Sequence, residues 1–135
     1  MTTLTGYSEH RRLSVAGSDA ERSRTRTIVL WTLQIGAAAL FLLAGASKLL
    51  GAPAMVQQFN AIGVGQWFRY LTGTIEVAAA LLLLMPSLAF VGAVLLVPTM
   101  AGAIVAHLFV IGGNPVPAIV LLGVAAAVAL LRRPW

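Results

Sequence analysis

Cysteine and charge are the two features that this sequence has least of. The 135 residues include no cysteine, four acidic residues and nine basic ones, of which Lys48 is the only lysine. The absence of thiols excludes disulfides, thiolate nucleophiles and CxxC redox pairs. Charged residues make up 10% of the chain, whereas soluble domains average about 25%. Since 59% of the residues are hydrophobic, the composition predicts a single domain that lies in a membrane.

Metal ligands and cofactor motifs are also scarce. The two histidines, His10 and His107, lie far apart in the sequence, so we expect neither a metal cluster nor a bis-histidine haem. The sequence contains no nucleophile elbow, P-loop, dinucleotide glycine fingerprint or haem attachment motif. We therefore expect no catalytic residue, no metal and no cofactor other than a quinone. Whether the chain takes part in an enzyme stays open.

The net charge of +5 does not indicate nucleic-acid binding. Five of the nine basic residues lie in the first 26 positions, and Arg132 and Arg133 follow the last apolar run. Basic residues that flank apolar runs usually report membrane topology. We therefore expect no nucleic-acid partner.

The chain divides into a polar tail and an apolar domain. Residues 1–26 have few apolar positions to bury, so we expect a disordered tail on the cytoplasmic side. Residues 27–135 contain four runs that approach the roughly 20 residues needed to cross a bilayer. These runs are 28–50, 68–85, 88–111 and 116–131. Because lipid cannot hydrogen-bond the backbone, each run must be helical, which predicts an all-α fold, a bundle of four transmembrane helices.

The placement of lysine and arginine predicts the orientation. Three arginines within residues 22–26 precede the first run, two more follow the fourth, and the loop 51–67 contains neither lysine nor arginine. The positive-inside rule therefore places both termini in the cytoplasm and the loop outside. We expect a multi-pass protein of the cell membrane, in contact with membrane lipid.

The loop 51–67 has the pattern of a short helix. Pro53 suits the first turn, and four apolar residues share an arc of about 120° at 100° per residue. They are Met55, Val56, Phe59 and Ile62. We expect a short interfacial helix between the first and second membrane helices, ending at Gly63 or Gly65. This helix either anchors the loop in the outer leaflet or covers a binding site as a lid.

Ionisable residues inside the apolar runs are costly in lipid, so each needs a partner or a purpose. Alternating helix directions bring a lysine, an arginine and a histidine into the outer half of the bundle, with a glutamate just beneath them. Gln34 shares a face of the first helix with the lysine. The resulting ligand-binding or polar cluster consists of Lys48, Arg69, Glu76, His107 and Gln34. We expect Lys48 to pair with Glu76, because Arg69 lies about 10 Å away along the same helix.

Two interpretations of this cluster stay open. Polar side chains that face inward can hold membrane helices together. They can also line a pocket that binds a ligand or handles a proton. Pro98 is predicted to kink the third run, since its ring removes one backbone hydrogen bond, and a kink can create such a pocket.

The residues between 27 and 131 resemble the DoxX family of small four-helix membrane proteins. The stretches that carry the resemblance are 42–49, 55–65 with 67–69, 73–76 with 81–86, and 101–107. Several members of that family take their names from redox contexts, among them a subunit of a thiosulfate:quinone oxidoreductase. Related animal proteins assist the assembly of membrane receptors. Some relatives use cysteine pairs, which this sequence lacks.

The resemblance implies a non-catalytic membrane subunit or adaptor of a redox-related complex, with a lipid or quinone pocket around Glu76. Its expected partners are membrane lipid, membrane or redox proteins and further copies of the chain. One alternative is an assembly or stability factor for other membrane proteins. Another is a small transporter centred on Glu76, although neither internal repeats nor broken helices are evident.

Overall fold

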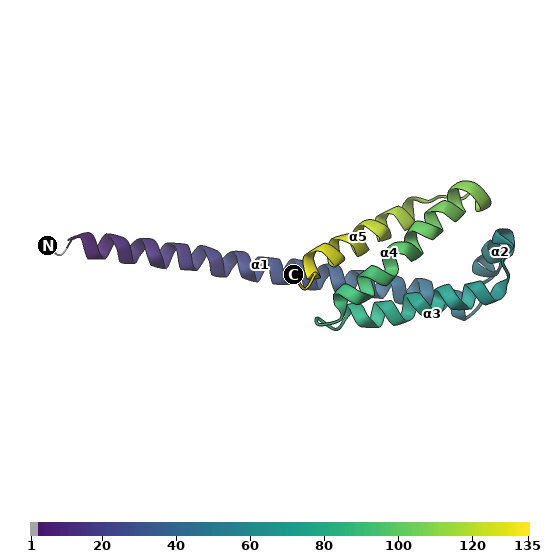
Figure 1. The fold of residues 1–135 in the computed structure, drawn as a ribbon, viewed down its shortest axis with the longest axis horizontal. Helices are drawn as coiled ribbons and strands as arrows, with labels where there is room; N and C mark the ends of the chain where they lie inside the picture. The colour runs from purple at the N-terminus through teal and green to yellow at the C-terminus, as the bar shows by residue number, and fades with distance from the viewer. Residues whose placement is uncertain (1–2) are drawn as a thin grey trace. The chain divides into compact units, whose positions relative to one another are not determined.

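The computed structural model describes residues 3–135, and the side chains from residue 6 onward. This part of the chain is all-helical, without a strand, as the sequence predicts. Figure 1 shows its elements in order: α1 (Thr3–Leu49), α2 (Pro53–Ile62), α3 (Gln66–Leu83), α4 (Ala89–Ala106), the π-helical segment η1 (His107–Ile111) and α5 (Val116–Arg132). The chain forms two compact units, Met1–Thr32 and Leu33–Trp135, which we call the N-terminal and C-terminal units.

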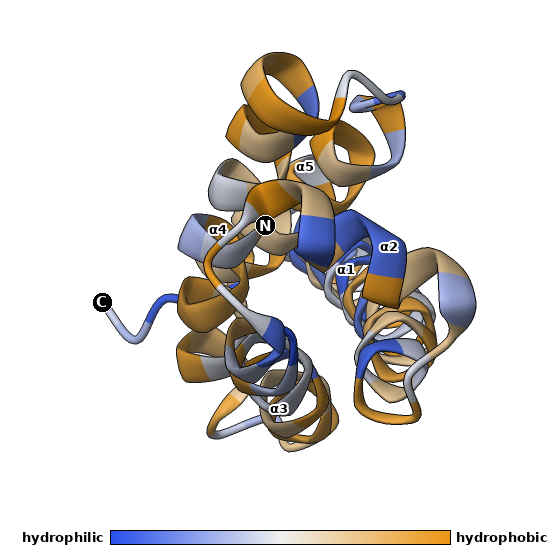
Figure 2. Cartoon of the chain, turned by 90° about the vertical axis from the view of Figure 1, so that its right-hand side faces the viewer, coloured by the Kyte–Doolittle hydropathy of each residue, from blue (hydrophilic) through white to orange (hydrophobic). Residues whose placement is uncertain are grey.

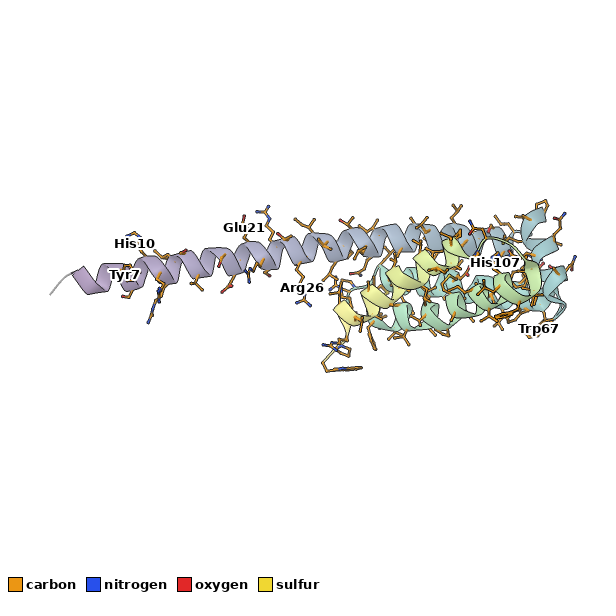
Figure 3. The ribbon with its side chains drawn as sticks, turned by 90° about the horizontal axis from the view of Figure 1, so that it is seen from above. Tyr7, His10, Glu21, Arg26, Trp67 and His107 are labelled. Atoms are coloured by element: carbon orange, nitrogen blue, oxygen red, sulfur yellow. The ribbon has the colours of Figure 1, made fainter. Side chains whose placement is uncertain are left out.

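The N-terminal unit is helical from Thr3, where its composition favours disorder. Residues 6–29 are all exposed, so burial of apolar surface does not explain this helix. Local contacts one turn apart accompany it instead: the hydroxyl of Thr25 donates to the Glu21 carbonyl at 3.0 Å, and Arg11 lies over the Tyr7 ring. Figure 3 shows the side chains of Tyr7, Glu21 and Arg26 spread along this helix. The sequence argument considered only burial, and helix formation needs each backbone group to find a partner within its own segment.

The C-terminal unit packs four helices around a core of small and medium-sized side chains. Alanines fill much of this core, which lets neighbouring helices approach closely. The core residues include Ala37, Phe41, Ala79, Leu83, Ala93, Leu96, Ala125 and Val128 from α1, α3, α4 and α5. Gly92 of α4 lies so close to α3 that a Cβ there would meet the Ala79 carbonyl oxygen at 2.6 Å. Small residues therefore set the spacing between these helices.

The outward faces of the same helices are apolar as well. Large side chains on α3, α4 and α5 stay exposed, including Leu71, Leu81, Val91, Val105, Ile119, Val120 and Leu130. The ribbons of these three helices are mostly orange to tan in Figure 2. Exposed apolar surface of this extent indicates a membrane or a partner, whereas a monomer in water rarely carries it.

Two helices are long and apolar enough to cross a membrane, within Gly6–Leu49 and at Ala89–Ile111. The second of these joins α4 to η1, and Pro98 lies inside α4. The third apolar helix, α5, has 17 residues, and α3 has 18 residues that include two charged side chains. Length and composition thus single out two spans among the described residues.

The short helix expected in the loop 51–67 is present as α2. Pro53 occupies its first turn, and Gly63 ends it with a φ of 77°, a left-handed conformation that glycine adopts without steric cost. Phe59 of α2 is buried, and its ring lies 5.9 Å from that of Phe68 at the start of α3. Helix α2 also contacts η1, so this loop is packed onto the ends of two other helices.

Candidate functional site

Two glycines bring α1 and α3 together at the candidate site. A Cβ on Gly45 would lie 2.9 Å from the Gly73 carbonyl oxygen and 2.7 Å from Cγ2 of Val77. A Cβ on Gly73 would lie 3.0 Å from Cβ of Lys48 and 3.1 Å from the Gly45 carbonyl oxygen. The two backbones therefore approach closely at these two residues, because neither glycine has a side chain. This contact places Lys48 beside α3, within reach of Glu76.

Lys48 and Glu76 form a buried ion pair. Nζ of Lys48 lies 2.8 Å from Oε2 and 3.1 Å from Oε1 of Glu76, so the ammonium donates to both carboxylate oxygens. The Glu76 side chain is 1% exposed and that of Lys48 is 15% exposed. The predicted pairing is confirmed. Because charges are costly in a low-dielectric surrounding, each of these groups depends on the other for its compensation.

Arg69 belongs to the same cluster, but its hydrogen bonds go to the Lys48 backbone and to Gln66. Its Nη1 donates to the backbone carbonyl of Lys48, and its Nε donates to Oε1 of Gln66 at 2.6 Å. The guanidinium also lies 4.3 Å from the centre of the Tyr70 ring, a favourable cation–π contact. Arg69 thus holds the end of α1 in place, and Lys48 is the residue that pairs with Glu76.

Gln66 extends this network to α2. Its amide nitrogen donates to Oδ1 of Asn60 at 2.7 Å and to the Val56 carbonyl at 3.2 Å. Because Gln66 also accepts from Arg69, one chain of hydrogen bonds joins the end of α1, the start of α3 and α2. Asn60 and Gln66 were not among the predicted site residues, although Asn60 lies within the short helix and Gln66 follows its end by four residues.

The ion pair lies in the wall of a cavity of about 720 Å³. Helices α1 to α5 and η1 all contribute to its lining, which is mainly aliphatic and aromatic. Lining residues that surround the pair include Ala44, Phe59, Phe68, Thr72, Ile75, Leu95, Pro98, Met100 and Leu121. Ligand pockets usually measure about 300–1,000 Å³ and combine apolar walls with a few polar groups. Both the size and the lining of this cavity agree with that description.

His107 lines another part of the same cavity, with one nitrogen unsatisfied. Its Nε2 lies 3.1 Å from Nε2 of Gln58, a residue of α2 that also lines the cavity. Its Nδ1 is buried and has no hydrogen-bond partner among the described residues. A Cβ on Gly113 would lie 2.9 Å from this atom. Figure 3 shows His107 toward the end of the C-terminal unit that carries Trp67. Buried polar atoms without partners are rare in folded proteins.

Gln34 does not join this cluster, and its inclusion among the candidate site residues needs correction. Its amide nitrogen donates to the Leu83 carbonyl at 2.6 Å, and its oxygen accepts from Nε of Arg132 at 2.7 Å. It precedes Lys48 by 14 residues on α1, which is about 21 Å along a helix. Gln34 shares a helix face with Lys48, but it lies near the opposite end of α3.

The assembled groups suit the binding of a small molecule. No three histidine, aspartate or glutamate side chains within residues 6–135 come together as metal ligands would. The cavity offers an ammonium paired with a carboxylate, an imidazole and an amide, surrounded by apolar walls. Such an arrangement can hold an apolar molecule and orient its polar end.

Comparison with known proteins gives one match. A family model described as the DoxX-like family matches residues 32–131, which is 100 of the 135 residues. No curated protein and no solved structure matches the chain. The matched range contains Lys48, Arg69, Glu76 and His107, and together with the two long apolar helices it indicates an integral membrane protein. The resemblance seen in the sequence is confirmed, and the chain belongs to the DoxX-like family.

Proposed function

We propose that this protein is a multi-pass protein of the cell membrane that binds a lipophilic molecule in the cavity beside Lys48 and Glu76. In this role it serves as a non-catalytic subunit or adaptor of a redox-related complex, and the bound molecule is a lipid or a quinone. Four helices cross the membrane, both termini lie in the cytoplasm, and α2 lies at the outer interface.

The surface and the charge distribution support this topology. The outward faces of α3, α4 and α5 carry exposed leucine, valine and isoleucine side chains, which lipid solvates without penalty. The charged side chains of α3 turn inward, since Arg69 is 4% exposed and Glu76 is 1% exposed. Helix α3 can therefore cross lipid despite its two charges. Arg132 and Arg133 at the end of α5 suit a cytoplasmic end.

The observation that carries the binding role is the cavity beside the buried ion pair. If Lys48 and Glu76 only held helices together, close packing around the pair would serve that purpose best. Instead the pair borders about 720 Å³ of space with apolar walls. The adaptor role is carried over from the redox contexts in which members of the family are named.

Lipid extraction tests the binding role directly. The full chain is purified in a mild detergent, and its bound small molecules are extracted and identified by mass spectrometry. Ala103→Phe places a large side chain in the cavity and leaves Lys48 and Glu76 unsubstituted, because Ala103 lines the cavity from α4. Ala101→Phe is the matched control, since Ala101 lies on the same helix and is exposed outside the cavity lining. We expect a stoichiometric lipophilic molecule in the native chain and the control, and its loss from Ala103→Phe. Equal contents in all three proteins would contradict the proposal.

Affinity purification under the same conditions tests the adaptor role. Co-purification of redox enzymes supports it. Recovery of unrelated membrane proteins, without a redox enzyme, would replace it with the assembly-factor alternative.

Reporter fusions test the topology. Fusions at residue 1 and at residue 135 are both expected to report the cytoplasm, because four crossings return the chain to its starting side. Opposite readings at the two ends would require an odd number of crossings and would overturn the four-span proposal.

A further inference from the structure

We propose that the cavity selects a neutral lipid whose head group accepts hydrogen bonds through carbonyl oxygens, and that it rejects anionic phospholipids. Quinone rings and the esters of diacylglycerol share this chemistry. The inference rests on the proposed binding function and specifies the class of ligand that the cavity takes.

The charges that line the cavity cancel each other. Lys48 and Glu76 are the only lysine, arginine, aspartate or glutamate side chains among the lining residues. They lie at 2.8 and 3.1 Å from one another. Arg69 does not line the cavity, because its guanidinium is held by the Lys48 carbonyl, Gln66 and the Tyr70 ring. A molecule in the cavity therefore meets a neutral pair.

The same pair leaves a hydrogen-bond donor for a ligand. An ammonium group carries three N–H donors, and two of the Lys48 donors go to the two oxygens of Glu76. No hydrogen bond to another described residue uses the third, and Lys48 borders the cavity. The Glu76 carboxylate already accepts from Lys48 through both oxygens. A ligand head that accepts hydrogen bonds thus fits this wall.

An anionic head group suits this wall poorly. A phosphate close enough to accept from Lys48 would also lie close to the Glu76 carboxylate, because both carboxylate oxygens contact the same ammonium. Repulsion between like charges is strong where water is scarce. A cationic head group near Glu76 would be repelled by Lys48, whose ammonium already pairs with the Glu76 carboxylate. Neutral acceptors avoid both penalties.

His107 and Gln58 provide a second polar position in the cavity. Nε2 of His107 and the Gln58 amide come from η1 and α2, whereas the ion pair comes from α1 and α3. Between these polar groups the lining consists mainly of residues such as Phe59, Ile75, Leu95 and Met100. A neutral lipid with more than one carbonyl oxygen can use both polar positions while its apolar body contacts these side chains.

Equilibrium binding of three probes to the purified full chain in a neutral detergent tests this inference. The probes are a short-chain benzoquinone, a short-chain diacylglycerol and a short-chain phosphatidylglycerol, and the readout is the dissociation constant at fixed ionic strength. We expect at least one neutral probe to bind roughly tenfold or more tightly than phosphatidylglycerol. The neutral probe that binds more tightly shows whether the ligand carbonyl belongs to a quinone ring or to an ester.

Variants of the ion pair sharpen the test. Glu76→Gln removes the negative charge at constant shape, so phosphatidylglycerol is expected to bind roughly tenfold more tightly than it does to the native chain. Lys48→Met removes the donor and is expected to weaken the neutral probe by a similar factor. Arg133→Gln is the control, since this exposed arginine lies outside the cavity lining, and we expect it to change neither affinity.

The outcomes separate this inference from the binding function on which it rests. If phosphatidylglycerol binds the native chain as tightly as the neutral probes, the inference fails while the binding function stands. If no probe binds and Ala103→Phe does not alter the lipid content, the binding function itself fails. If Glu76→Gln does not fold, the ranking of the three probes on the native chain still decides the question.

Discussion

Two buried polar clusters hold the C-terminal unit together, and they differ in what surrounds them. At one end of α3, Gln34 is fully buried, and both its amide nitrogen and its oxygen have partners. Near the middle of α3, Glu76 is paired equally well with Lys48, yet the pair borders a cavity of about 720 Å³. Gln34 does not line that cavity.

The difference separates a contact that joins helices from a contact that faces a ligand. The Gln34 amide joins α1 to the end of α3 and to Arg132 at the end of α5, and close packing completes its surroundings. The ion pair, in contrast, borders the cavity, and His107 in the same lining has an unsatisfied nitrogen. We infer that the first cluster serves stability alone and that the second serves stability and binding together.

The largest expected effect comes from breaking the ion pair. Removal of either partner, by Lys48→Met or Glu76→Gln, leaves a buried group without its compensation and is expected to cost about 3–5 kcal/mol of unfolding free energy. The double variant is expected to cost much less than the sum, because it removes both charges together. A double-mutant cycle, measured by unfolding in detergent, determines the coupling.

Additive effects in this cycle would show that the two side chains do not stabilise each other. In that case Arg69→Met replaces Lys48→Met in a second cycle. Because Arg69 contacts the Lys48 carbonyl and Gln66, and forms no ion pair with Glu76 among the described residues, we expect Arg69 to couple to Glu76 less strongly than Lys48 does.

Much of the fold follows from local patterns in the sequence. The apolar runs at 68–85 and 116–131 lie within two residues of α3 and α5, because turns that contain Gly65, Pro86 and the stretch 112–115 separate them from their neighbours. The apolar face that ends at Gly63 predicts α2 for the same reason. The π-helical segment at His107–Ile111 does not follow from such patterns. A π-helix closes its hydrogen bonds between residues five apart, and η1 contacts α2, which is distant from it in the sequence.

A second variant tests the helix contact that places Lys48 beside Glu76. Gly45→Ala adds a Cβ that would meet the Gly73 carbonyl oxygen at 2.9 Å, so α1 and α3 must move apart. We expect a cost of about 1–3 kcal/mol in unfolding free energy, as overpacking usually causes, and a weaker coupling between Lys48 and Glu76.

Gly36→Ala is the matched control on the same helix. A Cβ on Gly36 meets nothing within 4 Å, and alanine favours a helix over glycine by about 0.5–1 kcal/mol. We therefore expect this variant to unfold at an equal or higher detergent concentration than the native chain. Equal destabilisation by both substitutions would show that the glycines do not set the helix spacing.

Part of the candidate site was within reach of the sequence and part was not. The Lys48–Glu76 pair follows from the cost of charges in lipid, which requires each to find the other. The error over Gln34 arose because residues that share a helix face point the same way but can lie far apart along the helix axis. The contact between Gln58 and His107 joins α2 to η1 across 49 residues, and no spacing in the sequence indicates how the short helix is rotated.

A third variant tests the closed cluster at the other end of α3. Gln34→Leu removes the donor to the Leu83 carbonyl and the acceptor for Nε of Arg132. Interhelical hydrogen bonds in membrane proteins contribute about 0.6 kcal/mol on average, so we expect a loss of about 1–2 kcal/mol in unfolding free energy. The content of bound lipid is expected to stay unchanged. A loss of bound lipid from this variant would break the distinction between the two clusters.

The smallest effect on stability is expected from Gln58→Leu, which tests the second polar position of the cavity. Gln58 touches His107 through one contact of 3.1 Å, and it is partly exposed on α2. Its loss is therefore expected to cost no more than about 0.6 kcal/mol. The variant is nevertheless expected to weaken binding of the neutral probe by a factor of about three to ten, because one of the polar groups that orients the ligand is lost. Gln57→Leu is the control, since Gln57 is the exposed neighbour on α2 and does not line this cavity. If both variants bind the probe as the native chain does, the ligand uses only the Lys48 end of the cavity, and the polar position at His107 serves to hold α2 against η1.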